Sequence, residues 1–142
     1  VQQELTARDG DASRGLSMFF NATVHDRQTN LVDNFLQAGL VYKGLFDSRP
    51  LDDFGVGVAR IHVNKDVAKG ARLANEVAGI DNYDDPRYMP VRHSEWDAEI
   101  HYGFVLTPWF TIRPNLQYVV QPGGVKEVDD ALIAGVKFIT KF

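Results

Sequence analysis

Polar and charged side chains recur at every second position in two neighbouring segments of the chain. They are Asp97, Glu99 and His101 in the first segment and Arg113, Asn115 and Gln117 in the second. Carboxylates accept hydrogen bonds, guanidinium groups donate them, and amides do both. A row of such groups offers repeated, reversible hydrogen bonds to a polar solute, which is a different chemistry from covalent catalysis.

Catalysis and metal binding lack support in the residue pattern. Glu99 and His101 share one face of a predicted strand, where they could assist a nucleophile. Ser94 and Ser17 are the candidate nucleophiles, but Ser94 lies at a strand end on the apolar face, and no strained elbow or oxyanion motif surrounds it. The four histidines are not spaced as metal ligands, and the chain has no cysteine. Acidic groups at 84–85 and 127–130 are interpreted as solvated loop charge rather than Ca²⁺ ligands. We therefore expect no enzyme, no metal site and no cofactor.

The bulk composition narrows the class of protein. The 142 residues suit one domain, 1–142, without a shift in composition. A net charge of −4 without charge blocks argues against a nucleic-acid partner. Mean hydropathy is −0.23, and the apolar stretches are interrupted within a few residues, so no transmembrane helix is expected. These values suit a membrane barrel, since only alternate strand residues face lipid.

Hydrophobic alternation with a period of two recurs in seven segments of the chain. A length of roughly ten residues is what a tilted strand of a membrane barrel requires. The predicted strands are 1–8, 14–25, 34–46, 54–64, 94–107, 109–121 and 131–142. In 54–64 we assign Ala59, Ile61 and Val63 to the apolar face. Arg60 and His62 then fall on the polar face.

The links between these strands alternate in length. Residues 9–13, 47–53 and 107–109 form short turns, whereas 65–93 is a link of 29 residues. Short turns on one side and long loops on the other are typical of outer-membrane barrels. Within the long loop, 66–77 predicts a brief helix, because Val67, Ala71 and Ala74 share a face. Pro114 cannot donate to a strand ladder, which predicts a bulge there.

Aromatic residues favour a membrane barrel over a soluble sandwich. On the apolar face, Phe46, Phe104, Phe110 and Phe142 lie near the short-turn ends, as an interfacial girdle would. Seven strands do not close a bacterial barrel, because an unpaired edge cannot face lipid. We therefore predict an all-β, antiparallel transmembrane barrel sheet that is part of a larger barrel. A small structural or anchor barrel and a soluble β-sandwich binding module are the alternatives.

Three stretches of sequence resemble the carbohydrate-selective porin family of the OprB type. They are TPWFTIRPNLQYVVQPGG at 107–124, GLFDSRPLDDFGVG at 44–57 and ALIAGVKFITKF at 131–142. The resemblance covers essentially the whole chain. It implies a sixteen-stranded barrel in the outer membrane of a Gram-negative bacterium, to which this chain supplies roughly the last seven strands.

The resemblance also implies function and partners. The channel would pass glucose and related small sugars by diffusion, with accompanying ion transport. Its outer surface would contact outer-membrane lipid and lipopolysaccharide. The last strand, which ends at Phe142, would be presented to the barrel-assembly machinery.

A sugar channel needs a wet wall that binds its solute weakly. The predicted pore-lining, substrate-binding residues are Arg60, His62, Asp97, Glu99, His101, Arg113, Asn115, Gln117 and Lys137. The expected cross-strand neighbours are Arg60 with Asp97 or Glu99, His101 with Asn115, Glu99 with Gln117, Arg113 with Gly103, and Lys137 with Asn115. Arg60 and Arg113 are the first candidates for sugar contact, because planar guanidinium donors suit hydroxyl groups. The alternative for Arg60 is an ion pair with an acidic residue of the wall.

Overall fold

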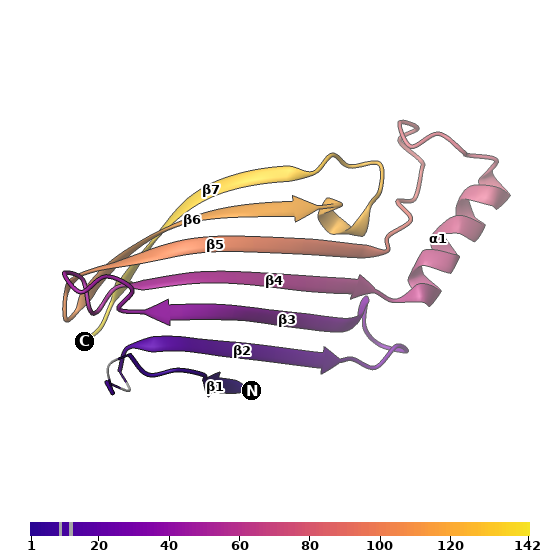
Figure 1. The fold of residues 1–142 in the computed structure, drawn as a ribbon. Helices are drawn as coiled ribbons and strands as arrows, with labels where there is room; N and C mark the ends of the chain where they lie inside the picture. Colours follow the sequence, from indigo (N-terminus) through magenta and orange to yellow (C-terminus); the bar gives the residue numbers. More distant parts are fainter. Residues whose placement is uncertain (9, 12) are drawn as a thin grey trace.

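The computed structural model describes residues 1–8, 10–11 and 13–142, which form one antiparallel sheet with a helix beyond one end (Figure 1). The strands are β1 (Gln2–Glu4), β2 (Gly15–Val24), β3 (Val32–Lys43), β4 (Asp53–Val63), β5 (Ser94–Thr107), β6 (Phe110–Val120) and β7 (Ala131–Thr140). Each strand pairs with its neighbour in sequence, from β1 to β7. The long β4–β5 connection contains α1 (Lys65–Ala78), and the short helix η1 (Pro122–Gly124) follows β6. The predicted antiparallel all-β fold is confirmed.

Strand alternation gives the sheet one face that carries most of its polar side chains and one face that is mainly apolar. Glu99 pairs with Gln117, and Ile100 pairs with Leu116, so polar and apolar rows each continue from strand to strand. We call the face of Glu99 the inner face and the face of Ile100 the outer face. Because the sheet is a single layer, its outer apolar side chains are not covered, and Trp96 is 50% exposed. Soluble monomers rarely expose so continuous an apolar surface.

A buried carboxylate holds the turn between β3 and β4 against β5. Asp52 is 3% exposed and accepts hydrogen bonds from Arg49 at 2.8 and 3.1 Å. The Val105 backbone N–H and the Tyr102 hydroxyl donate to the same carboxylate at 2.9 and 3.0 Å. Burial opposes ionisation of Asp52, but these donors outweigh it and keep the pKa of Asp52 below its usual value. The turn is thereby fixed to the end of β5.

Two buried asparagines organise the loops at the other end of the sheet. Asn64, 1% exposed, caps α1 by accepting a hydrogen bond from the Asp66 N–H at 3.0 Å. Its amide also donates to two carbonyl groups of the β2–β3 loop at 2.6 and 3.1 Å. Asn75 exchanges two hydrogen bonds of 2.9 Å with the backbone of Met89. The helix, the β2–β3 loop and the segment returning to β5 are therefore joined.

The helix predicted at 66–77 is confirmed as α1, but its contact face differs from the prediction. The buried residues of α1 are Ala68, Ala71 and Asn75, whereas Val67 is exposed. The shift arises because Asn75 finds a polar backbone partner, which an apolar pattern cannot reveal. Among the described residues, α1 is too short and too polar to cross a bilayer as a helix.

The bulge predicted at Pro114 is wrong. Pro114 pairs with Val136 in a register that continues without a break along β6 and β7. The irregularity lies instead between Val105 and Thr107, beside the tight β5–β6 turn. On the β5 side, Pro114 has no paired residue, because it lacks an N–H that could donate to β5. The proline therefore removes a hydrogen bond between the strands but does not insert an extra residue as a bulge would.

Candidate solute-contacting wall

A hydrogen-bonded row of polar side chains crosses the inner face at Glu99. Asn115 and Gln117 on β6 donate to one carboxylate oxygen of Glu99 at 2.9 and 2.5 Å. The Nζ of Lys137 on β7 lies 3.5 Å from that same oxygen. The other oxygen lies 3.4 Å from Nδ1 of His101. Three neighbouring strands therefore contribute to one partly buried charged group.

A second carboxylate extends this row toward the turn end of the sheet. Asp53, the first residue of β4, lies 2.8 Å from Nη2 of Arg113. Its other oxygen lies 3.2 Å from Nε2 of His101. The imidazole of His101 therefore lies between Asp53 and Glu99. Asp53, His101 and Arg113 are each held in place by a polar contact with a residue on a different strand.

Glycines allow the polar side chains to lie flat against the wall. A Cβ at Gly55 would lie 2.7 Å from Nε2 of His101 and closer still to a ring carbon. A Cβ at Gly135 would lie 2.5 Å from Oδ1 of Asn115. Carbon atoms do not approach that closely without displacing their neighbours. The glycines thus keep the imidazole and the amide near the backbone and the space above them open.

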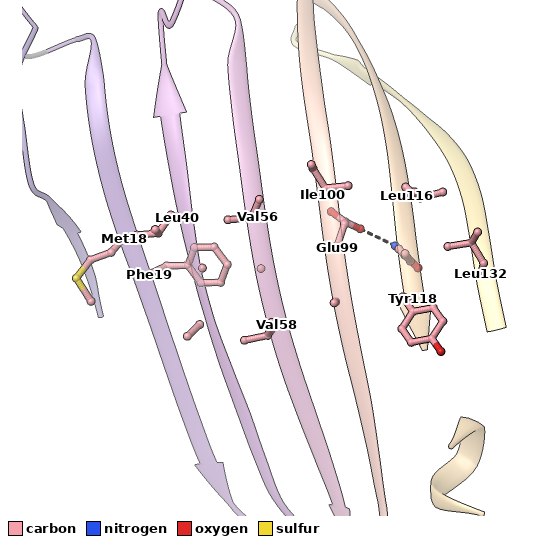
Figure 2. A pocket seen from close by; sticks show the side chains of 15 residues that line it. Met18, Phe19, Leu40, Val56, Val58, Glu99, Ile100, Leu116, Tyr118 and Leu132 are labelled. Atoms are coloured by element: carbon pink, nitrogen blue, oxygen red, sulfur yellow. Dashed lines mark hydrogen bonds between the residues drawn. The ribbon is translucent and has the colours of Figure 1, made fainter. Parts of the chain in front are cut away.

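The aromatic ring of Phe19 lies on the inner face, beside the polar row around Glu99. Phe19 pairs with Gly39 on β3, and Gly39 pairs with Gly57 on β4. A Cβ at Gly39 would be 2.5 Å from the ring, and one at Gly57 would be 3.5 Å from it, so the ring extends across both glycines (Figure 2). A recess of about 430 Å³ is lined by Phe19 together with Gln37, Asp97, Glu99, His101, Gln117 and Lys137. The ring and the polar row therefore border the same space.

Seven of the nine predicted wall residues lie on the inner face. They are Asp97, Glu99, His101, Arg113, Asn115, Gln117 and Lys137. The expected neighbours Glu99–Gln117 and His101–Asn115 are confirmed. Lys137 lies opposite Arg113 rather than Asn115, so the expected register of the last hairpin was displaced by two residues. Its expected position opposite Gly103 suggested that Arg113 has no partner in the wall. The structure differs, because Asp53 forms an ion pair with Arg113.

The placement of Arg60 and His62 on the polar face is wrong. Arg60 pairs with Trp96 and His62 with Ser94, which puts both on the outer face. Arg60 therefore meets neither Asp97 nor Glu99. The prediction failed because β4 carries apolar residues on both faces, and we assigned the charged residues to the side away from lipid. Near the edge of a bilayer, however, a cation on the lipid face costs only about 0–1 kcal/mol.

Asp53 and Phe19 are wall residues that the sequence interpretation missed. Asp53 was assigned to the turn 47–53, and Phe19 was left out of the polar face of its strand. The signal for Asp53 was the run Phe54-Gly-Val-Gly-Val58, in which apolar and glycine residues alternate. That alternation places Asp53 on the glycine face, opposite Gly103. Phe19 gave no such signal, because an aromatic residue does not indicate a polar face.

The outer face has the opposite character. Figure 2 shows apolar side chains from six neighbouring strands there, Met18, Leu40, Val56, Val58, Ile100, Leu116 and Leu132. They border a shallow hollow of about 540 Å³. Such a surface matches hydrocarbon and offers few hydrogen bonds. The inner face is therefore the candidate for contact with a polar solute.

The acidic loop segment at 84–85 has a local partner. Asp85 lies 2.7 Å from the guanidinium group of Arg87. Hydrogen bonds from the side chain and the backbone N–H of Arg87 lower the pKa of Asp85 to about 2.

Among the residues that the structure describes, no three histidine, aspartate or glutamate side chains gather as metal ligands would.

Comparisons with known proteins match the chain over its full length. Residues 1–142 fit the family model described as "Carbohydrate-selective porin, OprB family". Porin B of Pseudomonas aeruginosa is 61% identical over 142 residues, which are 100% of this chain and 31% of that protein. The high-pH structure of Pseudomonas putida OprB superimposes with a TM-score of 0.96 at 59% identity, covering 99% of this chain and 34% of that one. The low-pH structure of the same protein gives a TM-score of 0.69 at 45% identity.

These matches confirm the resemblance seen in 107–124, 44–57 and 131–142. The chain spans about a third of the length of the relatives that it matches. Its seven strands therefore correspond to part of a larger barrel, as predicted. The matching family is one of porins rather than enzymes. This chain belongs to the OprB family of carbohydrate-selective porins, which are outer-membrane proteins of Gram-negative bacteria.

Proposed function

We propose that the inner face forms part of the wall of a channel through which glucose and related small carbohydrates diffuse passively, together with small ions. The observation that carries this proposal is the recess shared by the Phe19 ring and the polar row around Glu99. A pyranose has hydroxyl groups around its edge and C–H groups on its faces. An aromatic ring beside hydrogen-bonding groups complements both kinds of surface.

The polar row suits passage rather than tight binding. Glu99 already accepts hydrogen bonds from Asn115 and Gln117, and Asp53 from Arg113. A sugar hydroxyl therefore exchanges with existing partners or with water, and each exchange gains only about 0.5–1.5 kcal/mol. A solute held by a few such bonds is released quickly, as conduction through a channel requires.

The test is solute-dependent swelling of liposomes that contain the full-length polypeptide carrying this sequence. We expect glucose to enter faster than an amino acid of comparable size. Glu99→Gln should reduce this preference, because it removes the charged acceptor to which three strands converge. Glu76→Gln, at an exposed position of α1 away from the wall, is the matched control and should behave as the unmodified protein.

Two outcomes would contradict the proposal. Ion conductance without glucose entry would identify a general ion pore. Absence of both, from correctly inserted protein, would favour the small structural or anchor barrel. The apolar exposure of the outer face already disfavours a soluble binding module.

The proposal extends to the partners of the channel. The outer face, with its apolar centre, would contact outer-membrane lipid and lipopolysaccharide. The strand β7, with Val136 and Phe138 exposed on the outer face, would be the segment recognised by the barrel-assembly machinery. Insertion into outer-membrane-like vesicles with and without purified assembly machinery tests this part separately.

A further inference from the structure

Arg60 has an unusual position for a charged residue, on the outer face near the loop end of β4. Its backbone pairs with Trp96 on one side and Leu36 on the other. The guanidinium group reaches toward the loop end, where Nε and Nη2 lie 3.3 and 3.2 Å from Oγ of Ser94. Nη2 also lies 3.2 Å from Nδ1 of His62, which is 2.8 Å from Oγ of Ser94. These two neighbouring side chains, Ser94 and His62, thus hold the cation in one orientation.

No carboxylate neutralises this cation among the described residues. Six other arginines of the described chain form ion pairs with aspartate. Arg60 forms none, and its neighbours Ser94 and His62 are uncharged or weakly basic groups. The guanidinium lies 5.6 Å from the centre of the Trp96 ring, a contact that stabilises a cation without cancelling its charge.

Further basic groups gather at the same end of the sheet. Nη2 of Arg72 on α1 lies 3.3 Å from Nε2 of His93, the residue before Ser94. Burial lowers the pKa of His93, and the nearby positive charges of Arg72 and Lys126 lower it further. Glu127 opposes this effect more weakly. The region between β4, β5 and α1 is therefore locally positive.

The row containing Arg60 marks a boundary between apolar and polar surface. On the turn side, the next outer-face pair is Val58 with Ala98, which is apolar. On the loop side, the next pair is His62 with Ser94, which is polar. Trp96 in the row of Arg60 is of the type that lines water–lipid boundaries, and long loops of outer-membrane barrels face the cell exterior. The cation therefore lies at the level of the headgroups of the outer leaflet.

We infer that Arg60, with His62 and Ser94, binds a phosphate group on the sugar headgroup of an outer-leaflet glycolipid, and that Trp96 packs against that lipid. Guanidinium groups bind phosphate oxygens through paired hydrogen bonds. Alternation along β4 places the Arg60 side chain on the outer face and not on the inner face with Glu99. Its unneutralised charge therefore faces the membrane. The inference rests on the outer-membrane placement of the chain but not on sugar permeation.

Native mass spectrometry of the full-length porin tests the inference, with bis-phosphorylated lipid A as the probe. We expect lipid A to remain bound to the unmodified protein and dephosphorylated lipid A to bind about tenfold more weakly. Arg60→Gln should weaken binding of the phosphorylated lipid by a similar factor, and Arg60→Lys should weaken it less. Lys69→Gln, which removes one exposed positive charge from α1, is the matched control and should change nothing.

Several results would overturn the inference. They are equal binding of phosphorylated and dephosphorylated lipid, full binding by Arg60→Gln, and displacement of the lipid by millimolar inorganic phosphate, which would indicate a site for the free anion. Heat-modifiable migration on gels checks that each variant is folded, and Arg60→Lys keeps the test informative if Arg60→Gln does not fold. Because liposome swelling is measured separately, a failure of sugar transport and a failure of lipid binding are distinguishable.

Discussion

Phe19 and Phe20 are consecutive residues of β2 that point to opposite faces, and this gives a matched pair of substitutions. Phe19→Ala removes the ring that lies across Gly39 and Gly57 in the recess of the inner face. Phe20→Ala removes an equal ring from the outer face, where Phe20 is 44% exposed. If the inner face contacts sugar, only the first substitution should change sugar binding.

The expected magnitude follows from the area that a sugar would cover. One face of the Phe19 ring corresponds to about 60 Å², roughly a third of the surface that a large aromatic residue can bury. At about 25 cal/mol per Å² this contact contributes about 1.5 kcal/mol. Loss of the ring should therefore raise the half-saturating glucose concentration roughly tenfold. The bare glycine backbone left behind offers no replacement surface.

The assay is a glucose titration of single-channel current in planar bilayers, performed on the full-length polypeptide. Sugar that occupies the recess reduces ion current, and the concentration for half-reduction reports its affinity. Gel migration before and after heating verifies that each variant is folded. Ion conductance without sugar should rise slightly in Phe19→Ala, because the ring no longer fills part of the recess.

The reasoning would be refuted by an unchanged half-saturating concentration in folded Phe19→Ala protein. An equal effect of Phe20→Ala would refute it as well, because it would trace the loss to a general disturbance of β2. A change in conductance without a change in sugar affinity would leave Phe19 as a space-filling residue and remove it from the recognition of sugar.

Three further predictions concern the wall, the turn end and the loops. Gly55→Ala should push His101 away from the wall, lower the free energy of unfolding by about 1–3 kcal/mol and raise the half-saturating glucose concentration. Gly57→Ala is the control and should be tolerated, because its Cβ would lie at an ordinary contact distance from its neighbours. Equal behaviour of the two variants in thermal melting and glucose titration would contradict the argument that Gly55 makes room for His101. Asp52→Asn should lower the stability of the barrel by about 2 kcal/mol near neutral pH, because it weakens charge-assisted hydrogen bonds. The pKa of Asp52 is lower in the folded protein than in the unfolded chain, so this stabilisation is present above the usual carboxyl pKa and is lost as the pH falls through the lowered value. The melting temperatures of the variant and the unmodified protein should therefore converge in acid. A difference that stays constant with pH would show that the ionised form of Asp52 is not the source of the stabilisation. Asn64→Ala should release α1 from the β2–β3 loop and speed amide exchange and proteolysis there, while Asn82→Ala, which removes a single exposed turn bond, should not.

Strand positions and the antiparallel sheet were accessible from the sequence, because hydrophobic alternation is a local property of each segment. The segment Ser94–Thr107 shows it clearly, and its tight turn to β6 set the register in which Glu99 meets Gln117. The helix in the long loop was accessible for the same reason. The sequence also carried the family resemblance, and with it the expectation of a porin wall.

Only the tertiary structure decided the face of β4 and the partners of its polar residues. Alternation in one strand defines two faces but does not say which is the inner face when both carry apolar residues, as around Ala59 and Val58. That choice depends on pairing across a link of 29 residues, whose length leaves the register undetermined. The register placed Arg60 on the outer face and brought Asp53 to His101 and Arg113. A one-residue shift inverts every side chain of a strand, so contacts across the sheet follow from the assembled strands and not from the sequence of any one of them.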